Sequence, residues 1–267
     1  MKTPLLICMR VHKNFNAVVD LIESVLTYTS GDLTKVMVAV DGGRGNLGHD
    51  LEQVFPGHVY ESKKIHAWGI SLLGFLFESI TWAKAHFEFE HFLSIDFDTA
   101  FVGTGVDEYL LSHIKEGTGM AGGLGCTVSW IRQYKKDKER IEKVLGPKPA
   151  SYTPGEGVQG GCMLLTAKFL EGMQKSGYLD RDWTSVTSLT DDHVLPLLCR
   201  YLGLGIEQVG GRALLSWKLR SAVTDLANRD IIVFHPMPKS SPSGELLCRN
   251  HFRKLRGAEP LRSLDHG

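Results

Sequence analysis

The sequence predicts an α/β protein with a mostly parallel central sheet flanked by helices. Three segments near its start predict this class: a continuous apolar run at 5–9, apolar residues at helical spacing over 15–26, and a run rich in β-branched residues at 35–40. They indicate a strand buried on both faces, a helix, and a second strand. Because a helix crosses between the two strands, we expect the strands to be parallel and the connection right-handed.

The alternation continues along the chain, and the later elements have their own signals. An almost uniformly apolar segment at 68–85 indicates a helix buried on most sides, and the apolar run before Asp96 indicates a strand. Prolines and glycines at 146–157 indicate a loop, and the charged stretch at 133–143 is typical of a solvated helix. Further strands are expected at 58–61, 119–123, 163–165 and 231–235, and further helices at 106–114, 168–175 and 192–202.

Composition argues against several classes of protein. Thirty basic side chains balance thirty acidic ones in 267 residues, so we expect no broad basic field and no nucleic-acid partner. The five cysteines are scattered and never in a CxxC spacing, which argues against a zinc site or a disulfide framework. No stretch approaches the roughly 20 apolar residues of a transmembrane segment, and the first apolar run is too short for a signal peptide. We therefore expect a cytoplasmic protein.

The sharpest motif is FLSIDFDTAFVG at 92–103, in which an apolar strand delivers two carboxylates at its end. Residues i and i+2 of a strand point to the same side, so Asp96 and Asp98 can face one divalent cation. A hard cation such as Mg²⁺ or Mn²⁺ takes one or two carboxylates and completes its shell with water and phosphate oxygens. The alternative is that one Asp begins a turn and the other caps a helix.

The strand, the DxD motif and the apolar continuation together resemble the metal-binding motif of GT-A glycosyltransferases, which use nucleotide-sugar donors. The resemblance implies one GT-A-like, Rossmann-like catalytic domain over 1–240, followed by a mildly basic C-terminal tail at 241–267. It also implies a nucleotide-sugar donor, an acceptor hydroxyl, and Mn²⁺ or Mg²⁺ held by Asp96 and Asp98, with Asp96 also facing the donor.

Two segments resemble the part of that family that contacts the nucleotide. VAVDGG resembles the second strand, whose terminal Asp contacts the base, and it nominates Asp41; a turn-forming Asp-Gly pair is the alternative. KIHAWGISLLG resembles the region where the chain passes the nucleotide, and it nominates Lys64, His66 and Trp68. A Trp before an apolar helix is more often part of the core.

Two later segments resemble the family's donor-facing strand and its final metal ligand. GVQGGCMLL nominates Gly160 and Gly161, which lack a Cβ and so let a substrate approach the backbone; a bulge or tight turn explains them equally well. FHPMPK nominates His235 as a third metal ligand and Lys239 as a contact to the donor diphosphate. A single His before Pro is more often structural.

TDDHVLPLLCRYLG resembles the acidic pair and helix of inverting members, in which the second carboxylate is the general base. This register makes Asp192 the base and Asp191 its support, although the first residue of the pair is more usually Glu, so the choice between the two stays open. Pro196 favours a helix that begins near Asp192 or His193, with the carboxylate at the positive end of the helix dipole. The alternative is a plain N-cap.

The predicted function is therefore a metal-dependent, inverting glycosyltransferase. The alternatives are a nucleotidyltransferase or a haloacid-dehalogenase-like phosphatase that uses Asp96 and Asp98, and a non-catalytic nucleotide-sugar binder. The phosphatase motif usually lies on the first strand, with Thr or Val where this chain has Ala100. Trp183 is either an acceptor-stacking residue or a core residue, and the loop at 146–157 either closes over the donor or is a plain connection.

Overall fold

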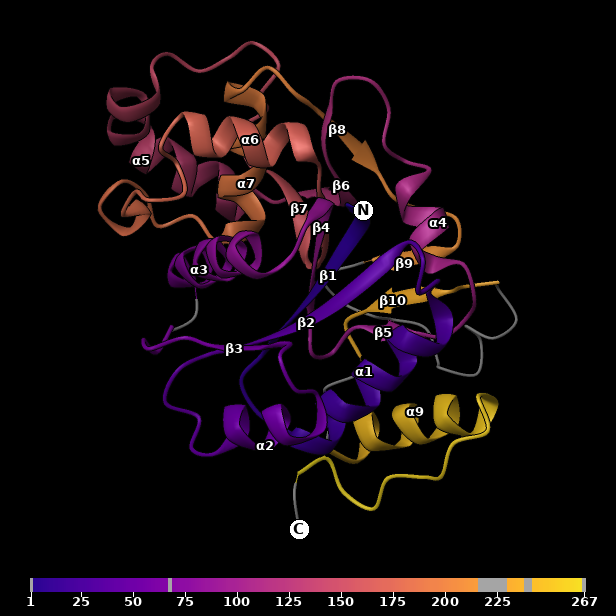
Figure 1. The fold of residues 1–267 in the computed structure, drawn as a ribbon. Coiled ribbons are helices and arrows are strands. Elements are labelled where there is room, and N and C mark those ends of the chain that lie inside the picture. The colour runs from indigo at the N-terminus through magenta and orange to yellow at the C-terminus, as the bar shows by residue number, and fades with distance from the viewer. Residues whose placement is uncertain (1, 67–68, 216–229, 238–241, 266–267) are drawn as a thin grey trace.

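The computed structural model describes residues 2–66, 69–215, 230–237 and 242–265, and it shows an α/β fold (Figure 1). The predicted class, a mostly parallel sheet flanked by helices, is confirmed. Trp68 and Lys239 lie outside the described residues. Over the described ranges, no helix combines the length and the apolar character that crossing a membrane requires.

A seven-stranded sheet in the order β3-β2-β1-β4-β7-β6-β8 forms the centre of the molecule. All of its pairs are parallel except those of β7, which is antiparallel to both β4 and β6. The strands are β1 Thr3–Val11, β2 Thr34–Val40, β3 Val59–Glu61, β4 Phe89–Asp96, β6 Thr118–Cys126, β7 Glu156–Leu165 and β8 Gly205–Gln208.

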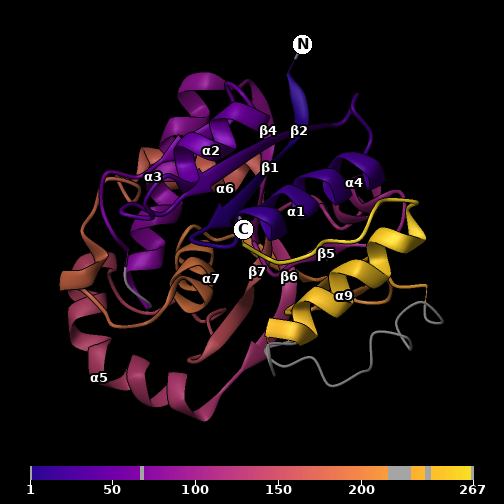
Figure 2. The same ribbon diagram turned by 90° about the horizontal axis from the view of Figure 1, so that it is seen from below.

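Helices cover both faces of this sheet (Figures 1 and 2). Alternate residues of β1 are buried against different helices: Leu5, Ile7 and Met9 share a core with α1, α2 and α4, whereas Leu6 and Cys8 share one with α3, α5, α6 and α7. The helices of the two layers are α1 Phe15–Tyr28, α2 Leu47–Val54, α3 Ser71–His86, α4 Val106–Leu111, α5 Val128–Leu145, α6 Ala167–Lys175 and α7 Asp191–Tyr201.

The strand order reverses beside β1. The chain passes from β1 to β2 and β3 on one side, then returns through α3 to β4 on the other side. Open α/β sheets bind ligands outside the carboxyl ends of the strands at such a reversal. In the parallel pairing of β1 with β4, Arg10 lies opposite Asp96, so both side chains reach this point.

A second, three-stranded sheet lies beside the first. It consists of β5 Ala100–Phe101, β9 Ala213–Leu215 and β10 Val233–His235, with β10 in the middle. Because β5 follows directly after the DxD turn and β10 ends at His235, this sheet brings two distant parts of the chain together.

The sequence analysis did not predict α2, β5, β8 and β9, and three of the segments that it did interpret differ from our expectations. β7 is longer than expected and runs antiparallel, which no local pattern indicates. α7 begins at Asp191, so Pro196 lies in its second turn rather than its first. The residues that we expected as a tail include a helix, α9 (Pro242–Leu255), which lies beside α1 in Figure 2.

Candidate active site

Asp96, Asp98 and His235 form the centre of the candidate site. One ligand atom from each lies within 4.8 Å of the others, with His235 Nε2 at 3.1 Å from Asp98 Oδ1 and 3.9 Å from Asp96 Oδ2. Asp98 and His235 are buried, while the side chain of Asp96 is one third exposed, so the cluster is open on one side. Gln159 Nε2 lies 3.1 Å from His235 Nδ1, so the other ring nitrogen of His235, Nε2, faces the two carboxylates.

This set of donors fits a divalent cation. Two carboxylates with one imidazole suit Mn²⁺ better than Ca²⁺, and the open side leaves room for water or phosphate oxygens in the coordination shell. Asp98 and His235 come from segments far apart in the sequence, and the pairing of β5 with β10 holds them together. The structure thus brings together the three residues that the sequence nominated as metal ligands.

Arg10 links this cluster to the acidic pair of α7. Its guanidinium lies 2.9 Å from Asp96 Oδ1 and 2.6 Å from Asp191 Oδ2, and it donates a 3.0 Å hydrogen bond to the Gly160 carbonyl. Burial lowers the pKa of Arg10, but the two carboxylates outweigh burial and raise this pKa above its ordinary value. Arg10 was not among the residues nominated from the sequence, although a charged residue directly after the apolar run LLICM is unusual and could have indicated it.

Asp191 and Asp192 occupy the first turn of α7 and differ in their surroundings. Asp191 is buried and paired with Arg10, whereas Asp192 is partly exposed. The N-cap residue is Thr190, so neither Asp fills that position. The helix dipole favours the ionised form of carboxylates in a first turn. Burial lowers the pKa of the neighbouring His193 to about 4, so this imidazole is neutral at pH 7.

Two glycines of β7, Gly160 and Gly161, lie against Asp192 and His235. A Cβ on Gly160 would lie 2.1 Å from Asp192 Oδ1, and a Cβ on Gly161 would lie 2.1–2.2 Å from three ring atoms of His235. We expected these glycines to make room for a substrate. The structure shows that the space a side chain would need is filled by the Asp192 carboxylate and the His235 ring.

A cavity of about 270 Å³ lies beside the cluster, and its lining includes Asp41, Arg44, His66, Asp96 and Asp98. Asp41 is buried at the end of β2, where it pairs with Arg44 and accepts a 2.8 Å hydrogen bond from the backbone N–H of His66. The sequence-nominated Asp41 and His66 therefore meet at the same cavity as the DxD carboxylates.

Glu78 connects His66 and Lys64. His66 is buried, with Nε2 3.3 Å from Glu78 Oε2, and the exposed Lys64 ammonium lies 3.4 Å from Glu78 Oε1. Burial raises the pKa of Glu78, but hydrogen bonds led by the one from Ser62 outweigh it and hold this pKa below its ordinary value. Lys64 lines a separate groove rather than the cavity at the cluster.

The remaining candidates have structural contacts. Trp183 is buried and donates from Nε1 to the Tyr178 carbonyl, consistent with a core residue. The segment before β7 packs Tyr152 against Tyr134, with ring centroids 5.3 Å apart.

Asp137 of α5 contacts the segment that leads into α7, where it accepts a hydrogen bond from the backbone N–H of Ser188. Burial raises the pKa of Asp137, but this hydrogen bond and others from side chains outweigh burial and lower the pKa to about 2.

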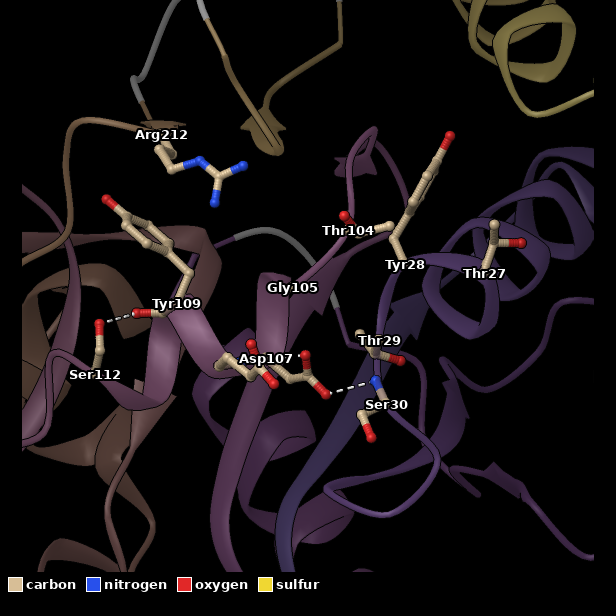
Figure 3. Close-up of a pocket in the computed structure, with 11 residues that line it drawn as sticks. Thr27, Tyr28, Thr29, Ser30, Thr104, Gly105, Asp107, Tyr109, Ser112 and Arg212 are labelled. Atoms are coloured by element: carbon tan, nitrogen blue, oxygen red, sulfur yellow. Dashed lines mark hydrogen bonds between the residues drawn. The ribbon is translucent and has the colours of Figure 1, made fainter.

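Another hollow, of about 670 Å³, lies between the end of α1 and the start of α4 (Figure 3). Its buried acid is Asp107, which accepts hydrogen bonds of 2.7 Å from the Ser30 backbone and 2.9 Å from Thr34 Oγ1. These contacts join α4 to the turn before β2. Asp107 thus has a structural role, away from the carboxyl ends of β1 and β4.

No protein-family model matches this sequence, and no curated protein matches it. Among solved structures, the bifunctional glycosyltransferase WbbM in its apo form is similar with a TM-score of 0.52 and 12% identity, over 93% of this chain. This chain spans 50% of the WbbM chain. Mouse xyloside xylosyltransferase 1 gives a TM-score of 0.49 at 12% identity, over 90% of this chain and 99% of that one. The galactosyltransferase LgtC, solved with donor and acceptor sugar analogues, gives 0.47 at 13%, over 94% and 95%.

At these identities, similarity shows the fold alone. The chain has a GT-A-like fold, with a DxD-like cluster at the carboxyl end of β4. The expected fold is thereby confirmed.

Proposed function

We propose that this chain is a metal-dependent glycosyltransferase that takes its sugar from a nucleotide-sugar donor. The observation that carries the proposal is a convergence at the carboxyl ends of β1 and β4. There, three candidate metal ligands lie next to a cavity, and Arg10 connects them to the acidic pair of α7. The GT-A-like fold supports the same reading.

The donor would lie along the cavity between Asp41 and the cluster. Asp41 and Arg44, which are paired with each other, line one part of this cavity, and their ion pair would face the nucleotide. Asp96, Asp98 and His235 would hold the cation near the diphosphate. When bound there, a divalent cation supplies Lewis-acid stabilisation of the diphosphate leaving group.

Asp192 is the proposed general base. It is partly exposed, stands in the first turn of α7, and lies against Gly160. Its carboxylate would take the proton of an acceptor hydroxyl, whose oxygen attacks the anomeric carbon from the face opposite the diphosphate. The configuration at that carbon would invert. Asp191, buried against Arg10, would hold the start of the helix rather than exchange protons.

The test is to incubate the purified protein with a panel of nucleotide sugars and Mn²⁺, with and without EDTA, and to measure the nucleotide released. Metal-dependent release of a nucleoside diphosphate, increased by an acceptor, is the expected result. Pyrophosphate formation would instead identify a nucleotidyltransferase, and phosphate release from simple esters a phosphatase. Binding without turnover would identify a non-catalytic binder.

The stereochemistry of the product tests the base separately. Proton NMR of the first-formed product should show an inverted anomeric configuration. A retained configuration would leave the transferase proposal standing and remove the role of Asp192.

A further inference from the structure

Helix α9 places a buried arginine against the DxD turn. Arg249 has no exposed side-chain surface, and its Nη2 donates a 2.6 Å hydrogen bond to the carbonyl of Phe97, the residue between the two candidate ligand carboxylates. The same guanidinium lies 3.0 Å from Asp20 Oδ2 of α1 and 2.9 Å from Glu245 Oε1 of its own helix. Arg249 thus joins the C-terminal helix, α1 and the turn.

The three carbonyls of the turn have donors from different parts of the chain. The Asp96 carbonyl accepts from the Thr99 N–H at 2.9 Å, which closes the turn locally. The Phe97 carbonyl accepts from Arg249, and the Asp98 carbonyl accepts from the Met237 N–H at 2.9 Å. One of these donors, Arg249, belongs to α9, and another, Met237, follows β10, so parts of the chain far from the turn hold it in place.

Helix α9 also supports the third candidate ligand. Cys248 and Phe252 of α9 pack with Phe234 and Met237, which flank His235, and with Ala100 next to the DxD turn. The ring centroids of Phe234 and Phe252 are 5.3 Å apart. One helix therefore contacts both pieces of chain that must meet to form the cluster.

We propose that Arg249 is a positioning residue for the metal cluster, because its hydrogen bond to Phe97 holds the carboxylates of Asp96 and Asp98 toward one point. The proposal rests on the proposed metal-dependent function. It gives the 241–267 segment a specific role, since the guanidinium that orients the turn belongs to α9.

Arg253, one turn further along α9, provides a matched control. It is also largely buried, and its Nη1 lies 3.0 Å from Asp20 Oδ1 and 2.6 Å from Glu23 Oε2, while its Nε donates to the Glu259 carbonyl. Its substitution would weaken the docking of α9 on α1 but leave the Arg249 bond to the turn in place. Comparing the two arginines therefore separates positioning of the turn from general attachment of the helix.

The experiment measures Mn²⁺ binding by electron paramagnetic resonance on the full chain, with thermal unfolding in parallel. Contacts that orient metal ligands typically contribute about 10- to 100-fold to metal affinity, so Arg249→Met should weaken Mn²⁺ binding by about that factor. Arg253→Met should lower the Tm while leaving the affinity within about twofold of wild type. Excess Mn²⁺ should restore the turnover of Arg249→Met, but it should not restore the turnover of a variant that is only unstable.

Arg249→Lys provides a second test if Arg249→Met fails to fold. A lysine keeps a cation opposite Asp20, but its single ammonium cannot contact Asp20, Glu245 and the Phe97 carbonyl together as the guanidinium does. This substitution should also weaken Mn²⁺ binding. Wild-type affinity in the folded Arg249 variant, or equal losses in the Arg249 and Arg253 variants, would overturn the inference alone. Absence of Mn²⁺ binding by the wild type would overturn the proposed function and the inference with it.

Discussion

Gly161→Ala would displace a metal-ligand candidate without altering any ligand. The new Cβ would lie 2.1–2.2 Å from Nε2, Cδ2 and Cε1 of the His235 ring, whereas ordinary contact begins at 3.4 Å. The ring must therefore retreat by about 1 Å or more. It has little room to do so, because it is buried with Gln159 at 3.1 Å and Asp98 at 3.1 Å.

The magnitude follows from that displacement. Misplacing a reacting group by about 1 Å costs on the order of 100-fold in rate. Losing one of three protein ligands should also weaken Mn²⁺ binding at least as much as losing a supporting contact, by about tenfold or more. We therefore expect Gly161→Ala to lower metal-dependent turnover by about 100-fold and to shift the Mn²⁺ titration to higher concentration.

Two assays check this expectation: nucleotide release from the donor identified in the panel, and Mn²⁺ binding by electron paramagnetic resonance. Gly31→Ala is the control, because a Cβ there meets no atom within 4 Å. Thermal unfolding shows whether either substitution disturbs the fold. Wild-type Mn²⁺ affinity in a folded Gly161→Ala protein would refute the role assigned to His235.

Four further predictions concern the surrounding residues. Gly160→Ala, whose Cβ would lie 2.1 Å from Asp192 Oδ1, should lower turnover while leaving Mn²⁺ affinity unchanged. Asp192→Asn should give a folded protein with turnover lowered by about 100-fold or more, the size of a general-base contribution. Arg10→Met should lower the free energy of unfolding by about 3–5 kcal/mol, because it leaves Asp191 buried without its partner cation. Asp137 has a folded pKa of about 2, below its ordinary value, so its contribution to folding stability is present above about pH 4 and is lost as the pH falls toward 2. Asp137→Asn should therefore lower the free energy of unfolding by about 1–2 kcal/mol at pH 7 and by little at pH 2.

Each of these predictions has its own measurement. Nucleotide release and Mn²⁺ titration separate the base from the metal site, and equal effects of Gly160→Ala on both would contradict our assignment. Near-normal turnover of Asp192→Asn would remove that residue as the base. Urea unfolding at pH 7 measures Arg10→Met, with a loss below about 1 kcal/mol arguing against a buried ion pair. Urea unfolding across pH 2–7 measures Asp137→Asn, and a pH-independent difference from wild type would contradict the sign.

The local patterns of the sequence predicted the elements that carry the candidate site. Apolar runs were enough for β1, β2 and the strand that ends in the DxD motif, because these strands are buried on both faces. Apolar periodicity was enough for α1, because that helix is buried along one face. The antiparallel direction of β7 had no such signal, because it depends on how β7 pairs with two other strands, β4 and β6.

The arginines of the C-terminal segment show the same limit. From the sequence they were an excess of charge in a mildly basic tail. In the structure Arg249, Arg253 and Arg256 are paired with Asp20 of α1. The apolar spacing predicted that Asp20 lies on a helix, but it did not indicate which residues would contact it. A pairing between residues so far apart in the chain is fixed only when both helices dock.

The sequence by itself determined the α/β class and nominated Asp96 and Asp98, because a carboxylate pair at the end of an apolar strand is visible in local order. His235 and Asp192 were nominated through the resemblance to GT-A glycosyltransferases. The tertiary structure alone decided how they meet. The pairing of β1 with β4 sets Arg10 beside Asp96, and β10 carries His235 to Asp98. Such contacts depend on strand register and on packing between distant segments, whereas periodicity reports only which face of one segment is buried.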